Sequence, residues 1–178
     1  MSWERVCMEI ASCGMHRVNK SGVGTWGAFV GLLIQSVLVW LGASFWEMLW
    51  VTLGVTIVAL VVTRPAERLM LRIYGRRKRH NGKLVEYDFN QDCLDETAGQ
   101  LWAGLFILLS DMPWWSMIIG FVLAFGLFRL FDIWKPGFIG YIEKKFPAGS
   151  AWGIVLDDVA AGILTWPILF FIYFIIMM

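Results

Sequence analysis

The chain has 178 residues, of which 58% are hydrophobic and 16% charged, and it contains 11 Trp and 13 Phe. Soluble domains average about 45–50% apolar and about 25% charged residues, so this composition excludes an ordinary soluble domain and indicates a membrane protein. The formal net charge is only +1. The length predicts a single domain over residues 1–178.

Long apolar runs alternate with polar segments along the chain. A helix needs about 20 apolar residues to span a bilayer, and the first two runs adjoin so closely that they predict a tight helical hairpin. Residues 1–25 are predicted to form a cytoplasmic or interfacial segment. Residues 64–93 are predicted to form a polar cytoplasmic surface segment, in which Pro65 suits the start of a helix. The predicted spans are 26–45, 48–62, 94–109, 114–134 and 151–178.

Positive charge is distributed very unevenly relative to these spans. Five spans place the N-terminus, residues 64–93 and residues 135–150 on one side, and all 15 Lys and Arg then fall there, counting Arg129 near its edge. The other side keeps only Glu47 and Asp111. Cytoplasmic loops are enriched in Lys and Arg, so the basic side is predicted to be cytoplasmic. The predicted fold is an all-α, polytopic membrane helix bundle with about five transmembrane helices.

The cysteine and histidine counts limit the chemistry of the chain. Cys7, Cys13 and Cys93 form an odd set without a CxxC pair, so we expect reduced thiols and no disulfide framework. His16 and His80 do not suggest a histidine metal cage.

Acidic residues stand at the ends of three predicted spans, all at the cytoplasmic edge of the membrane. They are Asp95 and Glu96, Asp132, and Asp157 with Asp158. Carboxylates that converge in a bundle repel one another unless a cation lies among them. Their hard oxygen ligands suit Mg²⁺, which also binds substrate phosphates. Ionisable groups at membrane depth indicate function by default.

Small and basic residues accompany these acids. Gly99 and Gly162 each follow an acidic pair by about one turn, and small residues at such positions let membrane helices approach closely. Arg129, Asp132 and Lys135 are spaced three apart and share one helix face. Arg129 offers a bidentate fork for a phosphate, and Lys135 offers a point charge.

Simpler interpretations of each feature remain open at this stage. For the acids, the simpler interpretation is that they do no more than mark the membrane interface. For Arg129, it is that the side chain extends to the interface and pairs with Asp132. The two glycines can serve packing alone. The basic run 76–80 is most simply a positive-inside signal that attracts anionic lipid.

Four segments taken in order resemble the phosphatidylglycerophosphatase A family. They are "GVGTWGAF" at 22–29, "DETAGQ" at 95–100, "FRLFDIWKPGFI" at 128–139 and "DDVAAG" at 157–162. The chain departs from the family pattern at three positions. Val23 stands where Pro is frequent, Ala28 where Ser is common, and Phe138 replaces the second proline of a KPxP pattern.

The resemblance implies a Mg²⁺-dependent multi-pass phosphatase of the bacterial inner membrane, with its N-terminus and active site on the cytoplasmic side. Its substrate would be phosphatidylglycerophosphate in the cytoplasmic leaflet, and its product phosphatidylglycerol. The metal and water-activating set implied is Asp95, Glu96, Asp157 and Asp158. Asp132 would be a further ligand or would orient Arg129, and the phosphate would be bound by Arg129, Lys135 and Thr25.

Other functions fit parts of the sequence. A related membrane phosphatase acting on another lipid phosphate is the main alternative, because these motifs do not show which lipid head group the site selects. An ion-coupled transporter would carry acids through the middle of its spans, where this chain has none. A non-catalytic membrane protein is a third possibility. Membrane lipids are the expected partners, nucleic acid is not, and the sequence leaves the oligomeric state open.

Overall fold

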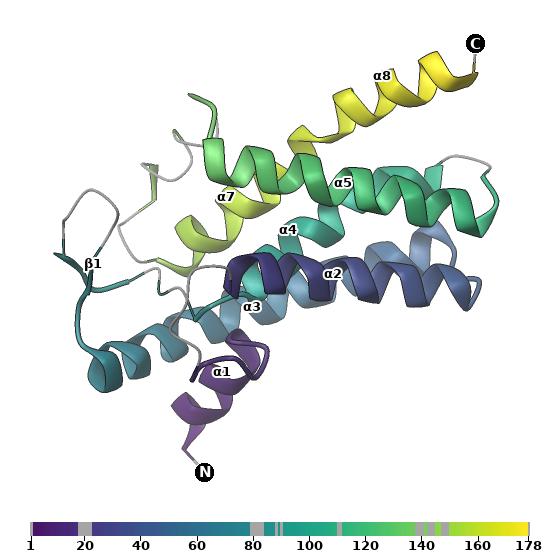
Figure 1. Ribbon diagram of the computed structural model, residues 1–178. Coiled ribbons are helices and arrows are strands. Elements are labelled where there is room, and N and C mark those ends of the chain that lie inside the picture. Colours follow the sequence, from purple (N-terminus) through teal and green to yellow (C-terminus); the bar gives the residue numbers. More distant parts are fainter. Residues whose placement is uncertain are drawn as a thin grey trace.

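The computed structural model describes residues 2–17, 23–78, 84–87, 89, 91–109, 112–137, 141, 145–146 and 150–177. These residues form a helix bundle with one small pair of antiparallel strands (Figure 1). The N-terminal elements are α1 (Trp3–Ala11), α2 (Val23–Trp40), α3 (Phe45–Tyr74), β1 (Arg77–Lys78) and β2 (Leu84–Val85). They are followed by α4 (Leu94–Leu105), the 3₁₀ turn η1 (Phe106–Leu109), α5 (Trp114–Trp134), α7 (Ala151–Leu164) and α8 (Trp166–Met177).

Four helical stretches among the described residues are long and apolar enough to cross a membrane. They are α2, α3, α5 and the continuous stretch Ala151–Ile175 that includes α7 and most of α8. This result confirms the predicted all-α polytopic bundle. The remaining predicted span, 94–109, forms α4 and η1, and α4 has only 12 residues. At about 1.5 Å per residue, α4 is shorter than a hydrocarbon core of about 30 Å.

One predicted boundary is wrong. Pro65 does not start a helix but lies inside α3, which runs unbroken for 30 residues from a Ser44–Glu47 capping box. Pro65 removes one backbone hydrogen bond, but the surrounding turns are held by packing, because Ala66 and Met70 are fully buried in a cluster with residues of α1. The predicted span 151–178 is confirmed as the stretch Ala151–Ile175. Within it, α7 ends at Leu164 and α8 begins at Trp166, next to Pro167.

Helix α4 occupies the centre of the bundle. Ten of its twelve residues are buried, and it packs against α2, α3, α5 and α7. Its C-terminal end lies inside the protein, where backbone carbonyls need donors because lipid offers none. Gln35 donates to the Leu101 carbonyl at 2.9 Å, and the indole N–H of Trp166 donates to the Trp102 carbonyl at 2.9 Å. These side chains let a short helix end within the bundle.

Backbones of α4 and α7 touch at two glycines. A Cβ atom at Gly162 would collide with the Gly99 carbonyl oxygen and lie 3.1 Å from the Ala103 nitrogen. A Cβ atom at Gly99 would lie 2.8 Å from the Asp158 carbonyl oxygen and 2.6 Å from the Phe128 ring. The expected close approach of these two helices is therefore confirmed.

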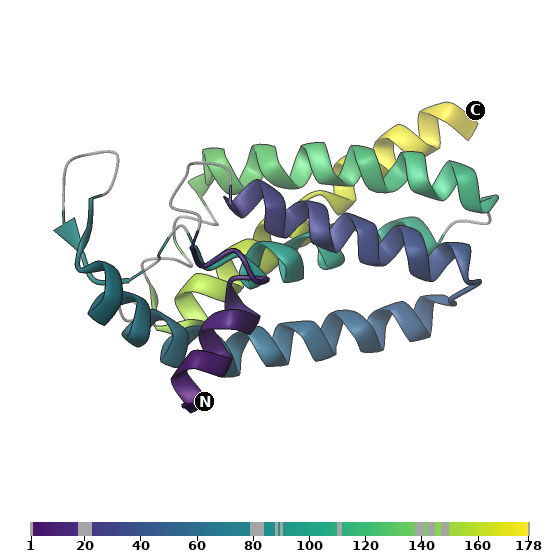
Figure 2. The ribbon, with the colours of Figure 1, turned by 60° about the horizontal axis from the view of Figure 1, so that its bottom comes forward.

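One end of the bundle collects most of the polar motifs. Figures 1 and 2 show that α2, α4 and α7 begin at this end, on the left in both views, and that α3 and α5 finish there. The acids in the first turn of α4, in the middle of α7 and near the end of α5 lie toward this end. The basic residues in the last turns of α3, in β1 and at the end of α5 lie at the same end.

Replacing Gly162 by alanine is expected to destabilise the fold, because the added methyl must push apart two helix backbones. Overpacking of this kind costs about 1–3 kcal/mol, and each kcal/mol lowers the melting temperature by about 2–4 °C for a chain of this size. The measurement is thermal unfolding in detergent. Gly126→Ala is the matched control, since nothing lies within 4 Å of a Cβ atom at Gly126 in α5. Equal melting temperatures for the two variants would contradict the contact.

Candidate active site

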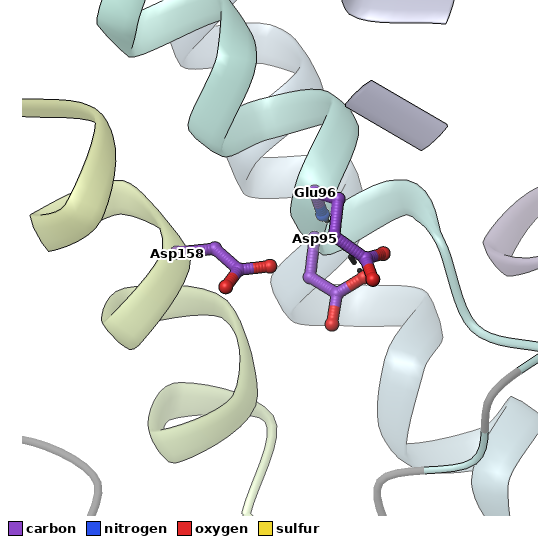
Figure 3. A group of neighbouring side chains, drawn as sticks. All are labelled: Asp95, Glu96 and Asp158. Atoms are coloured by element: carbon purple, nitrogen blue, oxygen red, sulfur yellow. Dashed lines mark hydrogen bonds between the residues drawn. The ribbon is translucent and has the colours of Figure 1, made fainter. Parts of the chain in front are cut away.

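Three carboxylates converge where α4 meets α7. Asp95 and Glu96 lie in the first turn of α4, and Asp158 lies in the middle of α7. One oxygen from each lies within 4.8 Å of the others. Figure 3 shows Asp158 pointing from α7 toward the two side chains of α4. Asp95 and Asp158 are only 6% and 5% exposed, and Glu96 is half-buried.

The start of α2 closes over this group. A Cβ atom at Gly24 would collide with the Glu96 carboxylate and lie 3.5 Å from Nη2 of Arg129. Only glycine leaves room there, which explains one glycine of the 22–29 motif. Oε2 of Glu96 is buried and has no hydrogen-bond partner among the described residues. A buried carboxylate oxygen without a partner carries a large desolvation cost.

Two ion pairs flank the three acids. Arg129 bonds Asp132 at 2.5 Å, with side chains 17% and 14% exposed. Lys135 bonds Asp157 at 2.5 Å. Lys135 stands just after α5 in a left-handed conformation with φ of 44°, and this turn brings it beside α7. Five carboxylates thus face two cations, and negative charge remains in excess.

Electrostatic proximity links these pairs to the three acids. Asp132 and Arg129 are both close enough to Glu96 to interact electrostatically with its carboxylate, the first repelling it and the second attracting it. The charges of Asp132 and Asp157 both act on Asp158. The guanidinium of Arg129 also stands over the Phe128 ring at 6.0 Å from its centroid. The motif residues of α4, α5 and α7 therefore form one charged site.

The structure distributes the predicted site residues over three places. Asp95, Glu96 and Asp158 form the central group. The ion pairs Arg129–Asp132 and Lys135–Asp157 lie beside it. Thr25 is exposed in the first turn of α2, one residue after Gly24. Phe138 lies outside the described residues.

Sequence reasoning missed a buried acidic pair next to this site. Asp92 is 4% exposed in the segment before α4, and Glu67 is 2% exposed in α3. Burial raises the pKa of the Asp92 carboxyl well above its usual range, and the charges of Asp95 and Glu67 raise it further. The sequence held a signal, because Asp92 precedes Asp95 by three residues and so adds a third acid to the same short stretch.

The central group can hold a divalent cation. Its donors are all carboxylate oxygens, the ligand type that Mg²⁺, Ca²⁺ and Mn²⁺ share. The partnerless oxygen of Glu96 is available as a ligand. A cation at this place would offset the excess negative charge of the five carboxylates.

Fold and site together define a polytopic membrane protein with a buried acidic centre at one end of its bundle. The family model for phosphatidylglycerophosphatase A matches residues 10–173. The chain therefore belongs to the phosphatidylglycerophosphatase A family, and it is an enzyme, a phosphatase.

Curated relatives agree with this assignment. A phosphatidylglycerophosphatase A of Haemophilus influenzae is 34% identical over 142 residues, covering 79% of this chain and 72% of the relative. Its Escherichia coli counterpart is 36% identical over 72 residues, covering 39% of this chain and 38% of the relative. A protein of Bacteroides thetaiotaomicron, named as a candidate phosphatidylinositol-3-phosphatase, is 29% identical over 140 residues, covering 79% and 76%. No solved structure matches the chain significantly.

Neutralising one acid of the central group is expected to stabilise the metal-free protein. In EDTA, Asp158→Asn removes one of three closely spaced, mutually repelling charges. The melting temperature should therefore rise by about 2–4 °C for each kcal/mol of repulsion removed. Added Mg²⁺ should raise the melting temperature of the parent protein but not that of the variant, since a ligand that binds only the native state stabilises it.

Glu86→Gln is the control for this experiment. Glu86 is 53% exposed and pairs with Arg76 at the surface, so its neutralisation should leave both melting temperatures nearly unchanged. A parent protein that Mg²⁺ does not stabilise would contradict cation binding at the three acids.

Proposed function

We propose that the protein hydrolyses the terminal phosphomonoester of phosphatidylglycerophosphate, releasing phosphatidylglycerol and inorganic phosphate. The observation that carries the proposal is the convergence of Asp95, Glu96 and Asp158 beside Arg129. A phosphomonoester dianion resists attack because of its own negative charge, so its hydrolysis needs concentrated positive charge. Membership of the phosphatidylglycerophosphatase A family supports this choice of substrate.

Mg²⁺ is the cation that we assign to Asp95, Glu96 and Asp158. When bound, it supplies positive charge to the phosphate and acidifies a coordinated water. Arg129, held by Asp132, presents its fork to the phosphate oxygens. Lys135, held by Asp157, adds a second positive charge. A carboxylate of the central group accepts the proton of the attacking water.

The roles of Asp157 and Thr25 follow from their places. Asp157 is engaged by Lys135, so we assign it to positioning that lysine and not to direct metal binding. Thr25 stands exposed at the start of α2, next to the glycine that borders Glu96 and Arg129. We assign its hydroxyl to a contact with the head-group phosphate.

We further propose that the protein lies in the bacterial inner membrane with its N-terminus and active site on the cytoplasmic side. The support is that basic residues collect at the same end of the bundle as the acids, and cytoplasmic ends carry the excess of Lys and Arg. A site at that end meets the phosphorylated head group at the interface while the acyl chains stay in the bilayer.

Another lipid phosphate is the second candidate substrate. The proposed site recognises a phosphomonoester group through its negative charge, and several lipids carry such a group. One relative carries a name that refers to phosphatidylinositol 3-phosphate. A transporter function has less support, because the acids of the site gather toward one end of the bundle and do not follow the spans across it.

The direct test is phosphate release from phosphatidylglycerophosphate by the purified protein in detergent, with Mg²⁺ or with EDTA. Release should require Mg²⁺, and Asp158→Asn should lower it by about 100-fold or more, since the charge stabilisation at stake is several kcal/mol and each 1.36 kcal/mol is about tenfold. Faster release from phosphatidylinositol 3-phosphate or phosphatidic acid would overturn the substrate. Release in EDTA that survives Asp158→Asn would overturn the site.

Arg129→Lys tests the phosphate-binding role. Lysine keeps the charge but not the planar fork, so kcat/KM should fall about 10-fold or more, the loss of one or two charge-assisted hydrogen bonds. Arg72→Lys is the control, because Arg72 is 65% exposed and pairs with Glu4 on the surface. Similar kcat/KM values for the two variants would argue against phosphate binding by Arg129.

A further inference from the structure

An open cavity lies between the last turns of α3 and the segment that carries β1 and β2. Its volume is about 610 Å³, within the range of about 300–1,000 Å³ that is typical of ligand pockets. Figure 1 shows β1 beside the end of α3, at the basic end of the bundle. The wall formed by α3 consists of Arg64, Glu67, Arg68 and Leu71, which share one helix face.

Positive charge is in excess around this cavity, because three arginines and two glutamates line it. Arg76 is paired with Glu86 at 2.6 Å. Glu67 is 2% exposed and accepts a backbone N–H at 2.8 Å. Arg64 and Arg68 are exposed one turn apart on α3, and Arg68 makes no ion pair within the described part of the chain. The cavity therefore favours an anion, and the planar fork of arginine suits phosphate oxygens.

The length of α3 places the two exposed arginines at the depth of the lipid head groups. Trp46 and Trp50, in the first turns of α3, are 66% and 70% exposed, and exposed tryptophans of membrane proteins gather at the interfaces. About 20 residues of helix cross the hydrocarbon core, so a helix anchored near Trp46 leaves the core near Ala66. Arg64 and Arg68 flank that position, where the phosphates of the lipids lie.

Apolar lining residues favour a lipid over a small inorganic anion. Leu71 and Leu84 line the cavity together with the arginines, and Leu84 is 63% exposed. Removing such apolar surface from water is favourable, and the glycerol and upper acyl carbons of a lipid can cover it. Inorganic phosphate has no apolar part to do so. A phospholipid therefore matches both the guanidinium groups and the leucines of this cavity.

We propose that this cavity binds the head group of an anionic phospholipid in the leaflet at the basic end of the bundle, with Arg64 and Arg68 bonding its phosphate. Basic pockets of membrane proteins bind such head groups. The site is distinct from the candidate active site, because no lining residue belongs to the three central acids or to the two ion pairs beside them. Binding of this lipid does not require hydrolysis, so it stands or falls separately from the proposed function.

Phosphatidylserine is the probe, because it is anionic but has no phosphomonoester and is neither substrate nor product of the proposed reaction. Full-length protein in a neutral detergent is titrated with this lipid, and native mass spectrometry counts the lipid molecules retained on each chain. The parent protein should retain one phosphatidylserine at low lipid concentration, and phosphatidylcholine, which has no net charge, should bind far more weakly. Arg68→Gln should weaken the binding of phosphatidylserine about 10-fold, in line with the loss of a charge-assisted hydrogen bond.

Arg72→Gln is the matched control, since Arg72 lies one turn after Arg68 on α3, pairs with Glu4 and does not line the cavity. It should bind phosphatidylserine as the parent protein does. Glu86→Gln should have the opposite effect to Arg68→Gln, because it releases Arg76 from its ion pair and adds a guanidinium for the phosphate. Equal melting temperatures of the variants without lipid show that the fold is intact.

Equal losses of phosphatidylserine binding in Arg68→Gln and Arg72→Gln would overturn the proposal in favour of diffuse surface attraction. Equal binding of phosphatidylcholine, or displacement of the lipid by inorganic phosphate, would overturn the anionic phospholipid as the ligand. Unchanged lipid binding by Arg68→Gln, with loss of phosphate release from phosphatidylglycerophosphate, would place Arg68 in the active site instead. Lipid binding as predicted, without phosphate release by the parent protein, would overturn only the proposed function.

Discussion

Backbone contact between α4 and α7 is the constraint on which the site depends. Gly99 and Gly162 let the two helices approach until the carbonyl of Asp158 lies against Gly99, and this approach brings Asp158 to Asp95 and Glu96. The contact places like charges together in a buried position, which is unfavourable by itself. The fold therefore concentrates negative charge that Arg129 and Lys135 offset only in part, and we propose that a cation offsets the rest.

The same helix explains how a membrane bundle accommodates a short central element. α4 cannot span a bilayer, yet its carbonyls at Leu101 and Trp102 receive side-chain donors from Gln35 and Trp166. Irregular backbone at membrane depth is tolerated only where protein satisfies it. Surrounded by α2, α3, α5 and α7, α4 presents its first turn, with Asp95 and Glu96, at the end of the bundle where the basic residues lie.

Much of this architecture was predictable from the sequence, for physical reasons that also explain the failures. Apolar runs and the position of charge predicted the bundle, and the glycines at 99 and 162 predicted the close helix pair. The sequence could not show that α3 continues through Pro65, because packing against α1 outweighs the lost hydrogen bond. Nor could it show that tertiary contacts bury Glu67 and Asp92, which belong to the predicted polar surface segment 64–93.

The central claim is that the three carboxylates of α4 and α7 hold one divalent cation between them. A crystal structure of the protein soaked in Mn²⁺, with anomalous scattering to locate the ion, tests this claim most directly. The account predicts an anomalous peak bonded to oxygens of Asp95, Glu96 and Asp158 together. A structure in which these carboxylates are bonded by Arg129 or Lys135, with no anomalous peak among them, would contradict it.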